Sequence, residues 1–347
     1  MSFATKIEDW YSANSRALPW RETRNPYHIW LSEIILQQTR IEQGMSYYLH
    51  FVEAYPTVKD LADASEEQVL KSWQGLGYYS RARNLHATAR HIAYDLGGSF
   101  PSTYEEILGL KGIGPYTAAA IASFAFRIPR PVIDGNVYRL VARRFGIATP
   151  IATPAAYREF EELLSRLIDR ERPDLFNQAM MDFGSTYCRP SGPDCAGCIF
   201  SAECEAYRTG RVDLLPVRPA PPEVKRRFFY YLDLTFVRNG EPCTLMHCRR
   251  GKDIWKGLYE FPLIESDRPL AENELLMRIG RMVPKCEDAA IVLSLTHKLT
   301  HRTIEATFVE AKTAADVADS LPDETTILRR EIKNVPVSRL IDRYLNK

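Results

Sequence analysis

The sequence predicts a mainly α-helical N-terminal domain, a proline-rich linker and a smaller α+β domain. Residues 1–210 carry apolar residues at helical spacing and show no strand-like alternation of any length. Four prolines then lie between Pro216 and Pro222, and such a segment favours a semi-rigid spacer. Beyond it, FFYYLDLTFV, CTLMHC and AIVLSLT are rich in aromatic and β-branched residues, as strands are. We therefore expect a helical domain over 1–210, a linker over 211–227 and an α+β domain over 228–347.

Length and composition restrict the class of protein. The chain has 347 residues and 45% hydrophobic content, which is sufficient for two cores. The net charge is +1, and residues 1–210 carry 22 basic and 24 acidic side chains, so any nucleic-acid surface must be local. The N-terminus lacks an apolar signal core and no run reaches membrane length, so we expect a soluble, intracellular protein with no membrane partner.

The helical domain contains a series of periodic segments with start signals. Asn25-Pro26 is a helix start, and PYHIWLSEIILQQT continues the periodicity. Further helices are predicted near residues 41–54, 65–73, 80–96, 103–109, 116–126, 136–145, 154–170 and 174–186.

A tight hairpin is predicted at Leu110–Gly114, between two of these helices. Gly112 and Gly114 tolerate left-handed backbone or the close approach of another backbone, and Pro115 suits the first position of the next helix. The N–H groups at that helix start suit a phosphate, which makes Lys111, Gly112 and Gly114 candidate contacts to a DNA backbone. A simple interhelical turn is the alternative.

A single carboxylate, Asp134, follows within an arginine-rich stretch that we expect to face DNA. Asp134 is a candidate for chemistry, and it is also well suited to cap the helix beginning near Asn136. The arginines of this stretch are Arg127, Arg130, Arg139, Arg143 and Arg144.

LKGIGPYTA followed by VIDGNV resembles the helix-hairpin-helix DNA glycosylases, and SEIILQQT resembles their adenine-specific, MutY-type branch. The resemblance implies that Asp134 is the essential carboxylate, that Glu33 is the catalytic acid, and that Gln38 and Thr39 contact the strand opposite the excised base. Without it, Glu33 would be taken for an ordinary surface glutamate.

The expected chemistry suits these residue types. Release of adenine requires protonation of the base at N7, so the pKa of Glu33 must rise from about 4.3 toward neutral pH. Burial among Ile29, Trp30 and Ile34 would raise it. An ionised Asp134 would stabilise the sugar cation or trap it covalently, as the second carboxylate does in retaining glycosidases.

Tyr116 stands where the related endonuclease III type has its nucleophilic lysine, and Lys111 does not match that position. The resemblance therefore implies a monofunctional glycosylase in which Tyr116 helps to close the pocket and Asn136 supports Asp134. The alternative for Tyr116 is an aromatic residue that packs at a helix start.

Other matching segments imply a pocket and a wedge. RALPWR implies that Arg16, Trp20, Arg21 and Leu36 line the pocket for an extruded adenine, although Trp20 would also suit an ordinary core. FNQAMMDFG implies that Gln178 hydrogen-bonds the adenine edge. GLGYYSRARNL implies that Tyr78 inserts between bases, which base flipping requires, and that Arg81 and Arg83 approach phosphates.

Four of the seven cysteines lie together as C-x6-C-x2-C-x5-C, which indicates a metal site rather than a disulfide framework. Four thiolates suit zinc or an iron–sulfur cluster. The resemblance implies a [4Fe–4S] cofactor in the loop 188–204, held by Cys188, Cys195, Cys198 and Cys204.

In the C-terminal domain, DIWKGLYEFPLIE resembles MutT-like domains, but the acidic Nudix helix that holds magnesium is missing from the following segment. The resemblance therefore implies lesion recognition without hydrolysis. Leu295-Thr296-His297 would stand at the family's 8-oxoguanine-reading loop, with Thr296 and His297 contacting the lesion.

Taken together, the resemblance implies a monomeric, cytoplasmic, nucleoid-associated bacterial enzyme. It would remove adenine opposite 8-oxoguanine or guanine in double-stranded DNA. The alternatives are an endonuclease III-like glycosylase/lyase acting on oxidised pyrimidines and a non-catalytic iron–sulfur DNA sensor.

Overall fold

The computed structural model describes residues 1–220, 224–284, 286–314, 321 and 324–347. They form two compact units, residues 1–63 with 87–220, and residues 64–86 with 221–347. The sequence predicted a helical domain over 1–210, so the observed division differs from that prediction. The difference arises because residues 64–86 bond to the C-terminal segment: Tyr79 Oη donates to Val337 O at 3.2 Å, and Gln74 Nε2 to Asp342 Oδ1 at 3.1 Å.

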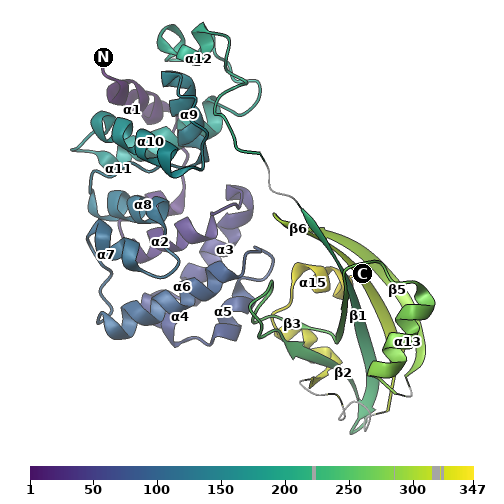
Figure 1. Ribbon diagram of the computed structural model, residues 1–347. Helices are drawn as coiled ribbons and strands as arrows, with labels where there is room; N and C mark the ends of the chain where they lie inside the picture. The colour runs from purple at the N-terminus through teal and green to yellow at the C-terminus, as the bar shows by residue number, and fades with distance from the viewer. Residues whose placement is uncertain (221–223, 285, 315–320, 322–323) are drawn as a thin grey trace. The chain divides into compact units, whose positions relative to one another are not determined.

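The first unit is helical in its described residues (Figure 1), and the predicted helices are present within a few residues of their expected bounds. Three helices, α1, α4 and the short α12, were not predicted. The elements are α1 (Phe3–Asn14), η1 (Pro19–Arg21), α2 (Pro26–Ile35), α3 (Ile41–Ala54), α4 (Val58–Asp63), η2 (His91–Asp95), α7 (Tyr104–Gly109), α8 (Pro115–Phe126), α9 (Gly135–Phe145), α10 (Pro154–Leu167), α11 (Pro173–Asp182), η3 (Phe183–Tyr187), η4 (Ser201–Glu203) and α12 (Glu205–Arg208).

Helix α2 is shorter than its periodicity suggests. Asn25 caps it by accepting the Tyr27 N–H at 3.0 Å, and Pro26 occupies its first turn. The helix ends at Ile35, however, and Gln38 has φ +55°. A left-handed residue cannot continue a right-handed helix, so the prediction of a helix through Thr39 is wrong.

The hairpin is confirmed between α7 and α8. Gly112 has φ +80°, and the Ile113 N–H donates to Leu110 O at 3.1 Å to close the turn. Leu110 and Ile113 are buried, which anchors the loop. Gly114 is extended, so Gly112 alone needs the conformational freedom of glycine.

Small side chains set the packing around α8. The buried alanines of this helix let it approach α2 and α11 closely. The start of α8 and the inward face of α2 thereby come together at one site. The alanines are Ala118, Ala119, Ala120 and Ala122.

The second unit contains α5 (Glu66–Ser72), most of α6 (Ser80–Arg90) and a seven-stranded sheet. The sheet is ordered β3-β2-β1-β6-β5, with β4 paired to β1 and β7 to β2. Strands β1 and β6 run parallel, and the other pairs are antiparallel. The strands are β1 (Lys225–Arg238), β2 (Glu241–Cys248), β3 (Tyr259–Glu260), β4 (Leu263–Ser266), β5 (Glu287–Lys298), β6 (Arg302–Lys312) and β7 (Thr325–Leu328).

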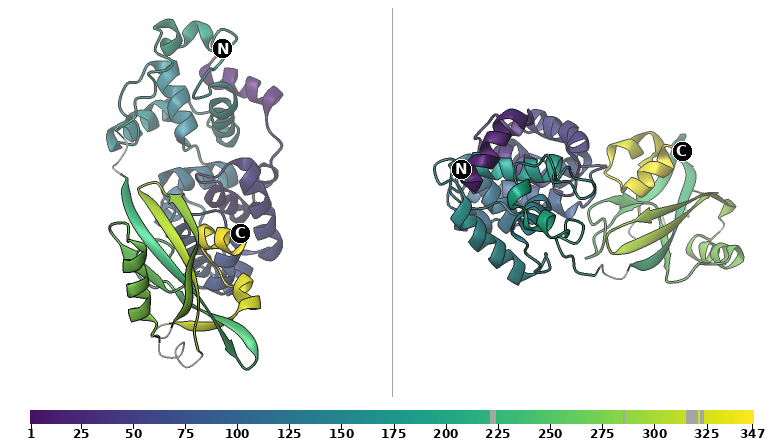
Figure 2. Two further views of the ribbon diagram at one scale, coloured as in Figure 1. Left: turned by 90° about the vertical axis from the view of Figure 1, so that its right-hand side faces the viewer. Right: turned by 90° about the horizontal axis from the view of Figure 1, so that it is seen from above.

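The three predicted strands are confirmed as β1, β2 and β5. The linker prediction runs three residues too far, because Lys225, Arg226 and Arg227 already pair with β6. Helix α13 (Glu272–Met282) lies on one face of the sheet and α15 (Arg339–Leu345) on the other (Figure 2), and η5 (Arg329–Asn334) precedes α15. Successive residues of β1 point to opposite faces of the sheet. Tyr230 packs in the hydrophobic cluster that includes α13, and Tyr231 packs in the cluster that includes α15. Within the described residues, no helix has the length and apolarity that a membrane crossing requires.

Candidate active site

A cavity of about 870 Å³ in the first unit collects most of the predicted catalytic and pocket residues. Its walls come from η1, α2, the turn after α2, and the starts of α8 and α9, with α11 closing one side. A volume of this size accommodates a small ligand such as a purine base. The predicted residues that line it are Arg16, Trp20, Arg21, Glu33, Leu36, Gln38, Thr39, Gly114, Tyr116, Asp134, Asn136 and Gln178.

Glu33 lies on the inward face of α2 and is 8% exposed. Its pKa is raised from the ordinary 4.5 to about 7, chiefly because burial disfavours the charged form, and the nearby Asp134 acts in the same direction. Tyr116 Oη donates to Glu33 Oε2 at 2.8 Å, and this bond opposes the shift by favouring the charged form. Ile29, Trp30 and Ile34 are buried, and Ile29 lines the cavity.

Asp134 is both a helix cap and a wall of the cavity. Its Oδ1 accepts the N–H groups of Asn136 at 2.8 Å and Val137 at 2.7 Å, at the start of α9. Its Oδ2 accepts Asn136 Nδ2 at 2.7 Å. The pKa of Asp134 is raised above its ordinary value, because burial outweighs these N–H donors and the Arg139 charge, which act to lower it. In all three bonds the carboxyl is the acceptor, and the positive end of α9 also favours the ionised form.

Asn136 joins this carboxylate to the cysteine segment through Arg139. Arg139 Nη2 donates to Asn136 Oδ1 at 2.9 Å and to Gly184 O at 2.5 Å. Its Nε donates to Cys188 O at 2.8 Å. A chain of hydrogen bonds through Asn136 and Arg139 therefore connects Asp134 to Cys188, the first of the four clustered cysteines.

The expectation that the arginines of 127–144 face DNA is wrong for Arg139 and Arg143. Both are buried, at 5% and 3% exposed, and both donate to backbone carbonyls. Arg143 bonds Val212 O at 2.9 Å and Arg189 O at 2.7 Å. The outer arginines engage protein acceptors as well: Arg127 pairs with Asp174, Arg130 with Glu105, and Arg144 bonds Glu203 O. The excess of arginine in this stretch therefore reflects side chains that anchor loops of the protein.

The four clustered cysteines line one small cavity beside Arg143. Arg143 Nη1 lies 3.6 Å from Cys188 Sγ, so a positive charge faces the thiols. Four cysteines beside a buried cation have the donor chemistry that an iron–sulfur cluster requires. Within the described residues, no group of three or more His, Cys, Asp or Glu side chains is arranged to hold a metal ion.

Two side chains that the sequence analysis did not single out organise the pocket. Asp182, whose side chain is fully buried, binds Arg21 through two bonds of 2.7 Å and Arg16 Nε at 3.1 Å. Tyr11 Oη donates to Gln178 Oε1 at 2.8 Å. Asp182 lies in the same FNQAMMDFG segment as Gln178. Sequence analysis could have found it as an acidic residue within an apolar stretch.

In the second unit, Tyr78 is 48% exposed and has φ +49°, an uncommon conformation that projects its ring from the chain. Arg81 stacks on the rings of Trp73 and Tyr78 at 5.1 and 5.5 Å, and burial lowers its pKa to about 10. Arg83 Nη1 donates to Lys256 O at 2.6 Å. Their predicted contact with phosphates stays a prediction, with Arg81 already serving as a support for Tyr78.

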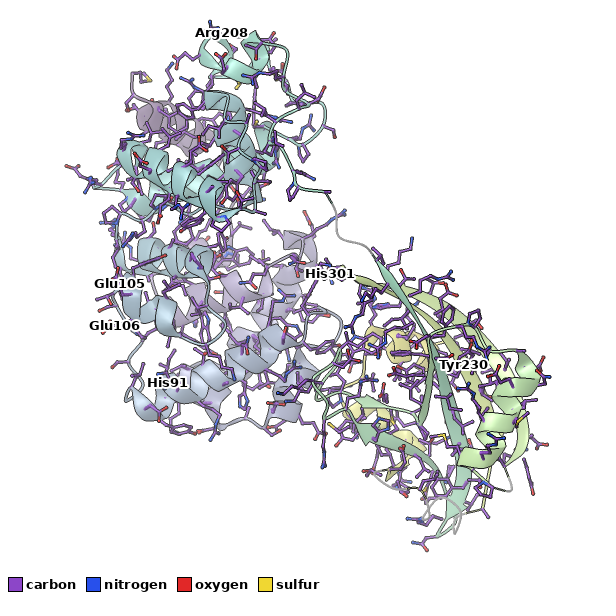
Figure 3. The ribbon with its side chains drawn as sticks, in the orientation of Figure 1. His91, Glu105, Glu106, Arg208, Tyr230 and His301 are labelled. Carbon is purple, nitrogen blue, oxygen red and sulfur yellow. The ribbon has the colours of Figure 1, made fainter. Side chains whose placement is uncertain are left out.

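Thr296 and His297 do not lie in a loop. Both belong to strand β5, where Thr296 pairs with Glu305 and His297 with Ile304. The same Leu-Thr-His pattern recurs four residues later at 299–301, in the turn before β6, and Figure 3 labels His301 there. Thr300 Oγ1 lies 2.7 Å from Tyr78 Oη. A cavity of about 460 Å³ adjoins the turn, lined by residues that include Tyr78, Arg83, Lys252, Trp255, Thr300 and Arg302.

Comparisons with known proteins identify relatives of this chain. Residues 31–167 match the HhH-GPD superfamily base excision DNA repair proteins. The adenine DNA glycosylase of Buchnera aphidicola is 32% identical, over 87% of this chain and 84% of that protein. The mouse adenine DNA glycosylase is 35% identical over 78% of this chain, but this chain spans only 53% of its length.

Solved structures show the same helical fold. A thermostable thymine-DNA glycosylase superposes with a TM-score of 0.56 and 30% identity, over 60% of this chain and 95% of its own. Endonuclease III in a non-covalent DNA complex superposes with a TM-score of 0.52 at 21% identity, over 60% of this chain and 99% of its own. With its hairpin, its buried carboxyl pair and a relative matched over most of both lengths, the chain belongs to the adenine DNA glycosylases, base-excision repair enzymes of the helix-hairpin-helix superfamily.

Proposed function

We propose that this enzyme removes adenine mispaired with 8-oxoguanine or guanine in double-stranded DNA, with Glu33 as general acid and Asp134 as the second carboxylate. The observation that carries the proposal is the position of Glu33: buried at the cavity wall, hydrogen-bonded to Tyr116, and with a pKa of about 7. A carboxyl with that pKa holds its proton for a substantial fraction of the time at neutral pH and can give it up during the reaction.

In the proposed reaction, the Glu33 carboxyl donates its proton to adenine N7. The bond between N9 and the sugar C1′ then breaks, with its electron pair moving to the departing base. The sugar cation is stabilised or captured at C1′ by the Asp134 carboxylate, and water completes the hydrolysis. Asn136 and the α9 N–H groups hold Asp134 in place for this role.

We propose that the enzyme is monofunctional. A lyase needs an amine that forms a Schiff base at the sugar, and Tyr116 occupies the corresponding position with its hydroxyl engaged by Glu33. Lys111 lies in the exposed hairpin and is not among the cavity-lining residues. Borohydride should therefore trap no covalent complex between protein and DNA.

The proposed DNA contacts fall on exposed positions. At the hairpin, Lys111, Gly112 and Gly114 are exposed, and a Cβ added at Gly114 would meet nothing within 4 Å, so a phosphate can approach this backbone. Gln38 and Thr39 lie on the turn at the cavity rim and would contact the opposite strand.

We propose that the second unit reads the base opposite adenine with Thr300 and His301, in place of Thr296 and His297. The turn at 299–301 is exposed at its threonine and histidine and adjoins a cavity with aromatic and basic walls. The bond between Thr300 and the projecting Tyr78 brings a base-stacking ring and a hydrogen-bonding hydroxyl into one place.

We propose a [4Fe–4S] cluster as the cofactor, held by the thiolates of Cys188, Cys195, Cys198 and Cys204. When bound, such a cluster supplies a rigid, electron-accepting centre whose ligand positions are all filled by protein. Arg143 would balance the negative charge of the cluster and anchor the surrounding loop. Arg139 connects this loop to Asn136 by hydrogen bonds.

The test is base release from duplexes that carry adenine opposite 8-oxoguanine or guanine, with alkali added to reveal abasic sites. We expect strand cleavage only after alkali, and we expect Glu33→Gln to bind the duplex but release at least about a hundredfold less adenine, since general acid catalysis contributes roughly 10²–10⁴. Undiminished release by Glu33→Gln would remove the acid assignment. Cleavage of thymine-glycol DNA without alkali would favour the endonuclease III-like alternative.

A further inference from the structure

Tyr11 lies behind the pocket and contacts two of its lining side chains, Gln178 and Arg21. The residue belongs to α1, is 7% exposed and is not among the cavity-lining residues. Its hydroxyl donates to Gln178 Oε1 at 2.8 Å, and Gln178 lines the cavity. The Arg21 guanidinium, held by Asp182, lies 5.7 Å from the Tyr11 ring centroid and packs the ring in place.

In this hydrogen bond the Gln178 amide turns its oxygen toward Tyr11. A primary amide offers an acceptor oxygen at one end and an NH₂ donor at the other. Because Tyr11 occupies Oε1, the NH₂ end is the one available to a bound base. Among the described residues the structure assigns Nε2 no hydrogen-bond partner of its own.

Three other groups of the base site can donate as well. Arg16 and Arg21 are donors only, and the Glu33 carboxyl is a donor while it holds its proton. Such donors pair with acceptors, and adenine offers unprotonated ring nitrogens. A reversed amide would instead offer an acceptor to the base.

We propose that Tyr11 is a positioning residue that holds the Gln178 amide with its oxygen toward α1 and its NH₂ end toward the cavity, where it can pair with an acceptor nitrogen of adenine. The inference rests on the proposed contact between Gln178 and the base. Tyr11 touches no reacting atom; it acts by holding the Gln178 side chain in this position.

The test is a double-mutant cycle on single-turnover adenine release. Tyr11→Phe should slow release about threefold to tenfold, the worth of one oriented hydrogen bond, and in the Gln178→Ala background the same substitution should have no further effect. The protein contains a matched control: Tyr27 is also buried, and its hydroxyl donates to Tyr55 O at 2.7 Å, remote from the cavity lining. Tyr27→Phe loses an equivalent bond and should release adenine at the parent rate.

A second readout uses duplexes with 1-deazaadenine or 3-deazaadenine, which keep N7 but lack one ring acceptor. For the analogue that has lost the acceptor facing Gln178, Tyr11→Phe and the parent enzyme should release the base equally fast. An equal loss from Tyr11→Phe on adenine and on both analogues, or an undiminished loss in the Gln178→Ala background, would overturn the inference. Failure of the parent enzyme to release adenine would instead overturn the proposed function.

Discussion

Replacing Glu33 by glutamine should stabilise the enzyme at high pH and leave its stability almost unchanged at low pH. The folded state raises the pKa of Glu33 from 4.5 to about 7, so folding favours the protonated carboxyl. A group with a raised pKa contributes its stability fully below pH 4.5, and that contribution is lost as the pH rises through about 7. Each pKa unit corresponds to 1.36 kcal/mol, so the ionised side chain costs about 3 kcal/mol at pH 8.5.

Glutamine removes this cost because it is neutral at every pH and can still accept the Tyr116 hydroxyl. The assay is urea unfolding followed by tryptophan fluorescence at pH 4.5 and pH 8.5. We expect Glu33→Gln to unfold together with the parent protein at pH 4.5. At pH 8.5 the variant should be more stable by about 3 kcal/mol, or by roughly 6–12 °C in melting temperature for a unit of this size.

An exposed glutamate provides the control for this experiment. Glu53 on α3 is exposed, and Glu53→Gln makes the same chemical change without burial. We expect that variant to follow the parent protein at both pH values. A constant stability difference between Glu33→Gln and the parent across the pH range would refute the reasoning, because it would show that the carboxyl does not change its protonation between the folded and unfolded states in this window.

Three further substitutions test the contacts around the two carboxylates. Tyr116→Phe removes the hydroxyl that favours ionised Glu33, so the pKa of Glu33 should rise further and the fall of adenine release with rising pH should shift upward by about one pH unit, as a pH–rate profile would record. Arg139→Gln deprives Asn136 and Cys188 of a buried donor; we expect a loss of about 3 kcal/mol in urea unfolding and slower base release with duplex affinity retained, and an unchanged release rate would contradict the coupling. Arg143→Gln removes the hydrogen bonds that Arg143 donates to loop carbonyls, so the proposed cluster should lose iron to a chelator about tenfold faster, measured from the visible absorbance. Parent-like iron retention would argue against the anchoring role.

Several features of the site could be predicted from local sequence because their causes are local. The hairpin depends on Gly112, whose positive φ few other residues tolerate, and on Pro115 at the start of α8. Asp134 caps α9 through the two N–H groups that follow it in the chain. Glu33 was singled out by the resemblance of SEIILQQT to the MutY type, and the apolar composition of its helix produces its burial and its raised pKa.

Other features depended on which distant segments meet. In the sequence, the arginines of 127–144 suggest a DNA-binding surface. In the structure, Arg139 and Arg143 point inward, because the cysteine segment supplies their carbonyl partners. Thr296 was assigned to a lesion-reading loop only because Leu295 and His297 flank it in the sequence. The β5–β6 register places it in a strand and leaves Thr300 at the turn.

The sequence by itself determined the family, through several short motifs, and it supplied the four clustered cysteines as a set. Glu33 and Asp134 were singled out by the resemblance that those motifs carry. Only the tertiary structure decided that Asp182 holds Arg16 and Arg21 and that Tyr11 hydrogen-bonds Gln178. The physical reason is that a hydrogen bond across more than 150 positions leaves no periodicity in the chain. It exists only once α1 and α11 have packed and burial has made an unsatisfied polar group costly.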